Sequence, residues 1–204
     1  MAADAKTVME LRERTGAGVM DCKAALQASD GNLDSAVEFL RKKGLADAKK
    51  REGRDAKDGL VHAYIHPGSK LGVLIEVNCE TDFVAKTPEF QGLVKDIAMH
   101  IAALSPLFVT KDEVPAEVLE KEKEIYRAQA AAQGKPLNVQ DKIAEGKLKD
   151  YYAQFCLLEQ PFVKDPAITV QDLVSSYIAK LGENIRVRRF ARFVLGESQD
   201  TPAS

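Results

Sequence analysis

Residues 71–90 read LGVLIEVNCETDFVAKTPEF, and this stretch holds a complete strand, loop and helix start. Every second residue from Val73 to Cys79 is apolar, which is the period of a half-buried β-strand. Thr87 is a good helix N-cap, and Pro88 is suited to the first helical position. The stretch therefore predicts a strand that leads through a short polar loop into a helix.

The loop itself places an acid and a large aromatic side by side, at Asp82 and Phe83. On a short loop between two rigid elements such a pair can contact a partner. In a core, one of the two side chains would be buried at a cost in free energy. The alternative is that Phe83 packs inward while Asp82 caps a turn. The residues alone leave both interpretations open.

The flanking segments complete an α+β core. Residues 60–65 alternate in polarity and residues 66–70 form a Pro-Gly turn, so residues 60–79 are predicted to be a β-hairpin. The helix that follows Thr87 should cover this hairpin with one apolar face, and His100 is expected on its surface. That face consists of residues at helical spacing: Phe90, Leu93, Val94, Ile97, Ala98, Ile101 and Leu104.

Three short helical patterns precede this core. They predict a small helical domain over residues 1–54, with the third helix ending at Gly44 and a charged linker over residues 41–57. A core domain is expected over residues 55–204. The linker is rich in Lys and Arg, a composition that can mark a phosphate-binding surface. Because no aromatic side chain is interleaved for base stacking, a solvated linker helix is favoured and no direct nucleic-acid contact is expected.

Two further units follow in the second half of the chain. Residues from about 112 to 157 predict a helical hairpin, turned at Gly134 and loosened near Gly146, which is a candidate assembly or dimerisation element. A helix from Thr169 to Gly182 then leads into a strand over residues 185–195. Its apolar face is expected to contain Ile185, Val187, Ala191, Phe193 and Leu195. The opposite face, with Arg186, Arg188 and Arg192, could bind phosphate, but a solvated face paired with acids is favoured.

Composition narrows the class of protein. The chain has 204 residues, of which 45% are hydrophobic and 29% charged, and its formal net charge is -2. These values predict a soluble globular protein with no overall electrostatic preference for nucleic acid or membranes. We see no apolar core of a signal peptide and no run near the roughly 20 apolar residues of a membrane span. A cytoplasmic location is therefore expected.

The sequence offers no catalytic machinery. It contains no phosphate-loop, dinucleotide-binding, zinc-protease or serine-hydrolase motif. The three cysteines lie far apart, which predicts small buried side chains, although Cys156 could pair between subunits. His62 and His66 lack a third ligand at suitable spacing. We expect no catalytic residue, no metal and no cofactor.

Several segments, in order along the chain, resemble the bacterial elongation factor Ts family. They are LRERTGAGVMDCK at 11–23, NCETDFVAK at 78–86, AMHIA at 98–102, QPFV at 160–163 and GENI at 182–185. The resemblance implies a guanine-nucleotide exchange factor for elongation factor Tu. It also implies a UBA-like three-helix bundle, an antiparallel-sheet core with covering helices, and a projecting helical hairpin. Binding of the exchange factor would oppose binding of GDP, and no bond chemistry would be needed.

The resemblance also implies roles for particular residues. Leu11, Val19 and Met20 match the contacts of the bundle with the nucleotide-binding domain of elongation factor Tu. The loop formed by Thr81, Asp82, Phe83 and Val84 matches the element that intrudes near the magnesium site of that protein.

The chain departs from longer family members, because it holds one half-unit where they hold two. The hairpin tip formed by His66, Pro67 and Gly68 matches the tip that the second half-unit presents to another domain of elongation factor Tu. One copy can hardly supply both this tip and the Asp82 loop. A homodimer that holds two partner molecules is therefore expected. The alternative functions are a UBA-type adaptor without exchange activity and an RNA-binding protein.

Overall fold

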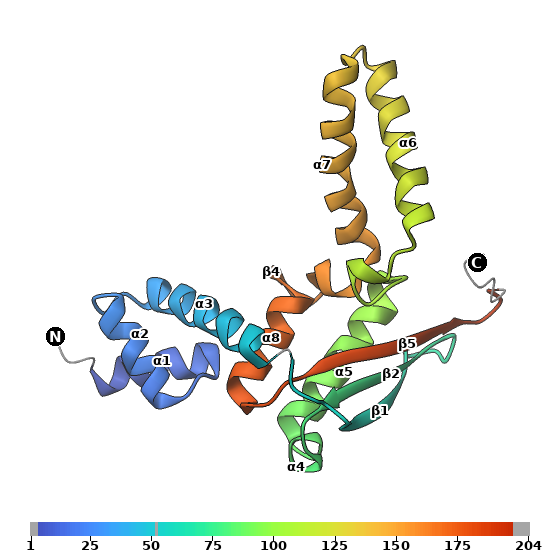
Figure 1. The fold of residues 1–204 in the computed structure, drawn as a ribbon. Helices are drawn as coiled ribbons and strands as arrows, with labels where there is room; N and C mark the ends of the chain where they lie inside the picture. Colours follow the sequence, from blue (N-terminus) through green and yellow to red (C-terminus); the bar gives the residue numbers. More distant parts are fainter. Residues whose placement is uncertain (1–3, 52, 198–204) are drawn as a thin grey trace. The chain divides into compact units, whose positions relative to one another are not determined.

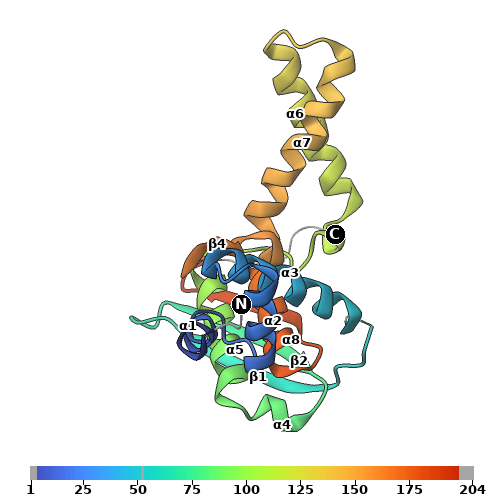
Figure 2. The same cartoon turned by 90° about the vertical axis from the view of Figure 1, so that its left-hand side faces the viewer.

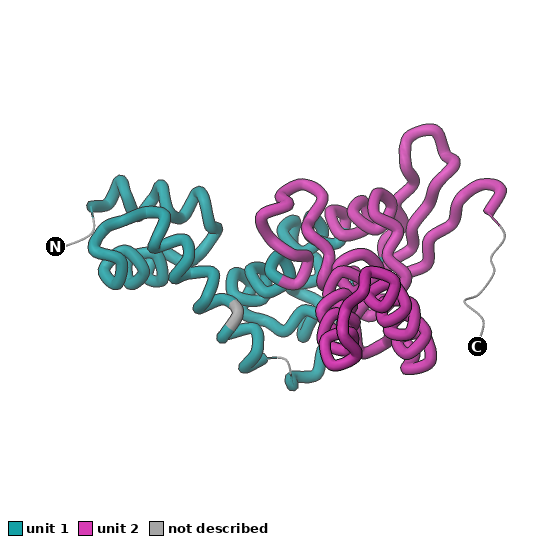
Figure 3. Tube along the Cα trace, turned by 90° about the horizontal axis from the view of Figure 1, so that it is seen from above, with its two compact units in different colours: residues 1–61, 76–94, 172–187 teal, residues 62–75, 95–171, 188–204 magenta. Residues whose placement is uncertain are grey.

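The computed structural model describes residues 4–51 and 53–197, and its chain trace is drawn in Figure 1. By contacts, the chain divides into two compact units, each built from separate segments (Figure 3). Unit 1 contains residues 1–61, 76–94 and 172–187, and unit 2 contains residues 62–75, 95–171 and 188–204. The α+β class expected from the sequence is confirmed.

The N-terminal part of unit 1 is a three-helix bundle. Helices α1 (Ala5–Thr15), α2 (Val19–Ala28) and α3 (Leu33–Arg51) pack on one another. Gly16 ends α1 with a φ of 66°, and the side chain of Asn32 accepts a hydrogen bond from the backbone N–H of Ser35. A small apolar core holds the three helices together: Val8, Leu11, Cys22, Ala25, Leu26 and Ala36.

Helix α3 runs past Gly44, so the predicted end at that glycine is wrong. A Cβ atom at Gly44 would lie 3.7 Å from the Cβ of Ala179 in α8 (Val170–Leu181). Such a Cβ atom would be in ordinary van der Waals contact, so α3 passes close to α8 at Gly44 and continues beyond it. Arg41, one turn earlier on α3, also pairs with Asp172 at 2.6 Å. Most basic residues of the expected linker lie within this long helix, whereas Arg54 and Lys57 follow its end.

The sheet contains three antiparallel strands in the order β1-β2-β5. They are β1 (Asp58–Ile65), β2 (Leu71–Cys79) and β5 (Arg186–Val194). The predicted apolar face of β2 is buried: Val73, Ile75, Val77 and Cys79. Gly59 has a φ of 136°, and a Cβ atom there would lie 2.1 Å from the carbonyl oxygen of Val77, so only glycine fits.

The predicted alternation of β5 is only partly right. Val187 is buried as expected, but Phe193 and Leu195 are exposed, and Ala191 is exposed with them. The side-chain pattern changes phase around Arg188 and Arg189, which are both exposed. One extra residue in a strand produces such a shift, because side chains alternate strictly with period two.

Helix α5 (Pro88–Leu104) begins as predicted, with the Phe90 N–H donating to the Thr87 hydroxyl at 3.2 Å. Its expected apolar stripe is buried, apart from Leu104. The expectation that His100 lies on the surface is wrong, because this residue is fully buried. Its Nε2 lies 2.9 Å from the side-chain oxygen of Gln160, and its Nδ1 accepts from the N–H of Val163. Burial lowers the pKa of His100.

The helical hairpin is present in unit 2. Helices α6 (Ala116–Ala132) and α7 (Leu137–Phe155) run side by side in both views of the chain (Figures 1 and 2). The turn between them contains Gly134 with a φ of 71°. Helix α7 is continuous through Gly146, so the predicted loosening there is wrong. At its base an aromatic and aliphatic cluster packs on the rest of the unit: Phe108, Val114, Val118, Leu119, Tyr151, Tyr152, Phe155 and Cys156.

Short elements complete unit 2. Two 3-10 turns, η1 (Lys111–Glu113) and η2 (Leu157–Glu159), flank the hairpin. Strands β3 (Pro161–Phe162) and β4 (Asp165–Thr169) form a small antiparallel pair that the sequence did not predict. All three cysteines are buried and free, as expected. Among the described helices, none combines the length and apolar character needed to cross a membrane.

Candidate binding loop

The predicted loop lies in unit 1 between β2 and α5, and its residues 81–84 are called the 81–84 loop below. Residues Asp82–Ala85 form a single helical turn, α4, that the sequence did not predict. The side chain of Thr81 caps this turn by accepting from the Val84 N–H at 3.4 Å. Phe83 is 81% exposed, which excludes the alternative in which it packs inward. The cap is Thr81, and not Asp82 as that alternative required.

Asp82 is exposed beside Phe83 and forms an ion pair with Lys86, one turn along the chain. The hydrogen bond between these two side chains lowers the pKa of the Asp82 carboxyl and raises the pKa of the Lys86 amine. The loop therefore presents a carboxylate that is ionised at neutral pH. Its charge is partly balanced by a cation of the same chain.

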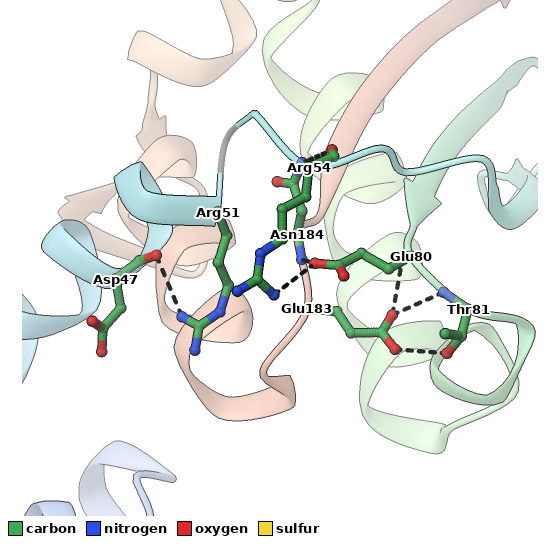
Figure 4. A network of polar contacts seen from close by, with 7 residues as sticks. All are labelled: Asp47, Arg51, Arg54, Glu80, Thr81, Glu183 and Asn184. Atoms are coloured by element: carbon green, nitrogen blue, oxygen red, sulfur yellow. Dashed lines mark hydrogen bonds and ion pairs between the residues drawn. The ribbon is translucent and has the colours of Figure 1, made fainter.

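The base of the loop is held by a carboxylate from a distant part of the chain (Figure 4). The side chain of Glu183 accepts hydrogen bonds from the backbone N–H groups of Glu80 and Thr81, both at 3.0 Å. Its other oxygen accepts from the Thr81 hydroxyl at 2.6 Å. Glu183 follows Gly182, which ends α8 with a φ of 77°. The turn after α8 thus delivers the carboxylate to the loop.

A second carboxylate, that of Glu80, accepts a hydrogen bond from the segment that carries Glu183. Glu80 accepts from the backbone N–H of Asn184 at 2.6 Å and pairs with Arg54 at 3.5 Å. The Asn184 side chain donates to the carbonyl oxygen of Arg54 at 2.8 Å. The two segments are therefore cross-linked, since each supplies a carboxylate to the backbone of the other. Glu183 and Asn184 both lie in the family-like segment at 182–185, but no local pattern in the sequence links them or Arg54 to the loop.

Cys79 lies directly beneath the loop. Its side chain is fully buried and its sulfur donates to the carbonyl oxygen of Thr81 at 3.1 Å. Burial raises the pKa of this thiol to about 11. The thiol is therefore protonated at neutral pH and acts as a small packing group.

The bundle residues singled out in the sequence occupy two kinds of position. Met20 is 75% exposed and Val19 is also exposed, at the start of α2. Leu11 has no exposed surface and belongs to the core of the bundle, so it supports the surface without forming it. Met9 and Phe39 are further exposed apolar side chains of the bundle, and no sequence motif singles them out.

The predicted hairpin tip lies in unit 2, whereas the 81–84 loop lies in unit 1. His66, Pro67 and Gly68 are all exposed, and the Nδ1 of His66 lies 3.1 Å from the Tyr64 hydroxyl. Within the described residues, no group of three or more His, Cys, Asp or Glu side chains is placed to hold a metal ion.

Unit 2 also carries an exposed apolar surface, called the outer sheet face and formed by Ile65, Leu74, Phe193 and Leu195. The Leu195 N–H donates to the carbonyl oxygen of Lys70, and in an antiparallel pair this register places Phe193 opposite Gly72. A Cβ atom at Gly72 would lie 3.0 Å from the Cδ1 atom of Ile65. Ile65 of β1 and Phe193 of β5 therefore lie on either side of this glycine on one face of the sheet.

Comparison with known proteins gives consistent results. The family model described as "Elongation factor TS" matches residues 46–197. Elongation factor Ts of Geobacter sulfurreducens is 59% identical over 204 residues, covering 100% of this chain and 94% of the relative. Elongation factor Ts of Carboxydothermus hydrogenoformans is 60% identical over 190 residues, covering 93% and 88%. That of Caldanaerobacter subterraneus is 60% identical over 193 residues, covering 95% and 96%.

Proposed function

The chain belongs to the elongation factor Ts family, and from this premise we propose that the 81–84 loop is the element that acts on elongation factor Tu. Proteins of this family are non-catalytic guanine-nucleotide exchange factors for elongation factor Tu in translation elongation. This chain therefore promotes release of GDP without making or breaking a bond. Its place of action is the cytoplasm, where translation takes place.

The observation that carries the proposal is the exposure of Phe83 on a turn that is itself firmly held. A GTPase binds GDP through a phosphate loop and a magnesium ion that bridges phosphate oxygens. Phe83, inserted beside the ion, shifts the groups that support it, and the adjacent Asp82 carboxylate competes for their hydrogen bonds. Loss of the ion's charge weakens the grip on the phosphates. By linkage, bound GDP weakens binding of the exchange factor to the same extent.

Stopped-flow release of a fluorescent GDP analogue from elongation factor Tu tests this proposal. The protein is added well below stoichiometry, as the wild type and as the Asp82→Ala/Phe83→Ala variant. Leu137→Ala is a matched control, because Leu137 is an apolar residue of unit 2 with 82% exposure. The expected result is fast release that the double variant loses and the control keeps. Undiminished release by the double variant contradicts the proposed role, and binding without release by the wild type favours the adaptor alternative.

The N-terminal bundle supplies a second part of the same interface in our proposal. Met20 and Val19 form an exposed apolar spot at the start of α2, and Leu11 belongs to the apolar core that holds the bundle together. In this proposal the bundle makes an apolar contact that adds binding energy, and the 81–84 loop alone reaches the nucleotide site. The bundle therefore sets affinity for the partner, whereas the loop sets the rate of release.

We also propose that two copies pair through the outer sheet face into a homodimer that binds two molecules of elongation factor Tu. Four apolar side chains from three neighbouring strands are exposed together there, and a two-fold axis would place each sheet on its own copy. Such a dimer presents two 81–84 loops and two hairpin tips formed by residues 66–68. One protomer can then offer its loop while its partner offers its tip.

A further inference from the structure

We propose that Glu183 is a positioning residue for nucleotide exchange, because its carboxylate fixes the shape in which the 81–84 loop displays Phe83. This inference rests on the proposed role of the loop. The Glu183 carboxylate accepts hydrogen bonds from Glu80 and Thr81, which precede it in the sequence by 103 and 102 residues.

The backbone loses its sheet hydrogen bonds where β2 ends. Beyond Cys79 the sheet ladder stops, and α4 does not begin until Asp82. The N–H groups of Glu80 and Thr81 lie between the two elements and need partners, since buried backbone donors are almost always paired. One oxygen of Glu183 accepts from both groups. The carboxylate thus replaces a missing strand at the point where the loop leaves the sheet.

The cap of the α4 turn is the side chain of Thr81. The Thr81 hydroxyl has one hydrogen, and it donates that hydrogen to the second oxygen of Glu183 at 2.6 Å. A lone pair of the same hydroxyl is thereby left facing the Val84 N–H, which donates to it at 3.4 Å. Glu183 therefore orients the cap of α4, and α4 carries Phe83. Charge-assisted hydrogen bonds of this kind are roughly twice as strong as neutral ones.

The turn that carries Glu183 is itself held by hydrogen bonds of the next residue, Asn184. Asn184 is buried, donates its N–H to Glu80 and donates its side chain to the Arg54 carbonyl (Figure 4). The carboxylate thus stands on a turn that is tied to the loop base by a separate set of bonds. Removal of the Glu183 carboxylate leaves this second set in place. The loop should then become mobile without loss of the surrounding fold.

Glu183→Gln is the sharpest test, because it keeps the size of the side chain. The glutamine oxygen can still accept from the backbone of residues 80 and 81, but its NH₂ group cannot accept from the Thr81 hydroxyl. The cap orientation is therefore lost. Thr81→Val removes the hydroxyl that Glu183 orients and should behave as Glu183→Gln. Glu145→Gln, on the exposed side of α7, is the matched control.

Two readouts are needed. Multiple-turnover GDP release gives kcat and KM for elongation factor Tu·GDP, and amide hydrogen exchange of the free protein reports the loop itself. For Glu183→Gln we expect kcat to fall about tenfold with KM within about twofold, the loss typical of one charge-assisted hydrogen bond. The amides of residues 80–84 should exchange about tenfold faster. Combining Glu183→Gln with Thr81→Val should add little to either single change.

The outcomes separate this inference from the proposed function. If Phe83→Ala leaves release intact, the role of the loop fails, whatever Glu183 does. If Phe83→Ala abolishes release while Glu183→Gln leaves kcat unchanged, the positioning role alone is overturned. A fall in kcat without faster exchange of the 80–84 amides also overturns it, because Glu183 would then act by another route. A fall in thermal stability with kcat preserved identifies a purely structural residue.

Discussion

Replacement of Phe193 by Ala should dissociate the proposed homodimer. Phe193 is 53% exposed at the centre of the outer sheet face. An aromatic side chain offers roughly 200 Å² of surface, so burial in a dimer removes about 100 Å² per copy from water. At about 25 cal/mol per Å² this contributes about 2.5 kcal/mol per copy and about 5 kcal/mol per dimer. The dimer Kd of Phe193→Ala should therefore rise by roughly 10³-fold to 10⁴-fold.

Sedimentation velocity over a range of concentrations measures this change directly. The wild type should be dimeric at micromolar concentration and Phe193→Ala monomeric, with unchanged circular dichroism. Met9→Ala removes an apolar side chain of similar exposure, 50%, from α1 and should leave the dimer intact. A monomeric wild type that is fully active in exchange, or a Phe193→Ala variant with the wild-type Kd, would refute the reasoning.

Three further predictions concern the bundle, a buried histidine and a strand glycine. Met20→Ala should raise the KM of exchange by about tenfold with kcat preserved, since truncation of an apolar anchor removes ground-state binding; Met9→Ala is the control, and a lower kcat would contradict the prediction. Burial lowers the pKa of His100 below its usual value of 6.5, so the unfolded chain binds the extra proton first. The contribution of neutral His100 to stability should be complete above pH 6.5 and lost as the pH falls through the folded-state pKa, and urea midpoints at a series of pH values will measure this loss. Replacement of His100 by Gln should reduce the dependence of the urea midpoint on pH, and an unchanged dependence would exclude His100 as its source. Gly59→Ala should lower the free energy of unfolding by more than about 2 kcal/mol, because its Cβ would collide with backbone and its φ is unfavourable for other residues; an urea midpoint equal to that of the wild type would contradict this.

The sequence predicted the position of the 81–84 loop well, for a local reason. The alternation of β2 stops at Cys79, and the Thr87 cap starts α5 eight residues later. Both ends of the loop are therefore marked by local sequence patterns. The exposure of Phe83 could not be decided locally. It depends on α4, a single turn whose cap is oriented by Glu183.

The errors share one physical cause, which is contact between segments far apart in the chain. His100 looked like a surface residue because no local pattern reveals Gln160, its partner at 2.9 Å. Gly44 looked like a helix end because its packing against Ala179 is invisible in the sequence. In β5 the burial pattern changes phase near Arg188 and Arg189, and no local pattern in residues 185–195 marks that change. The contact of Glu183 with the 81–84 loop also joins segments far apart in the chain, so the sequence did not reveal it.

The most direct test of the central claim compares GDP release with and without magnesium. If Phe83 acts through the magnesium site of elongation factor Tu, wild type and Phe83→Ala should differ greatly in the presence of magnesium. In excess chelator the ion is already absent, and the ratio of the two release rates should fall towards one. The same large ratio under both conditions would contradict the account, because the loop would then weaken GDP binding by a route that does not involve the ion.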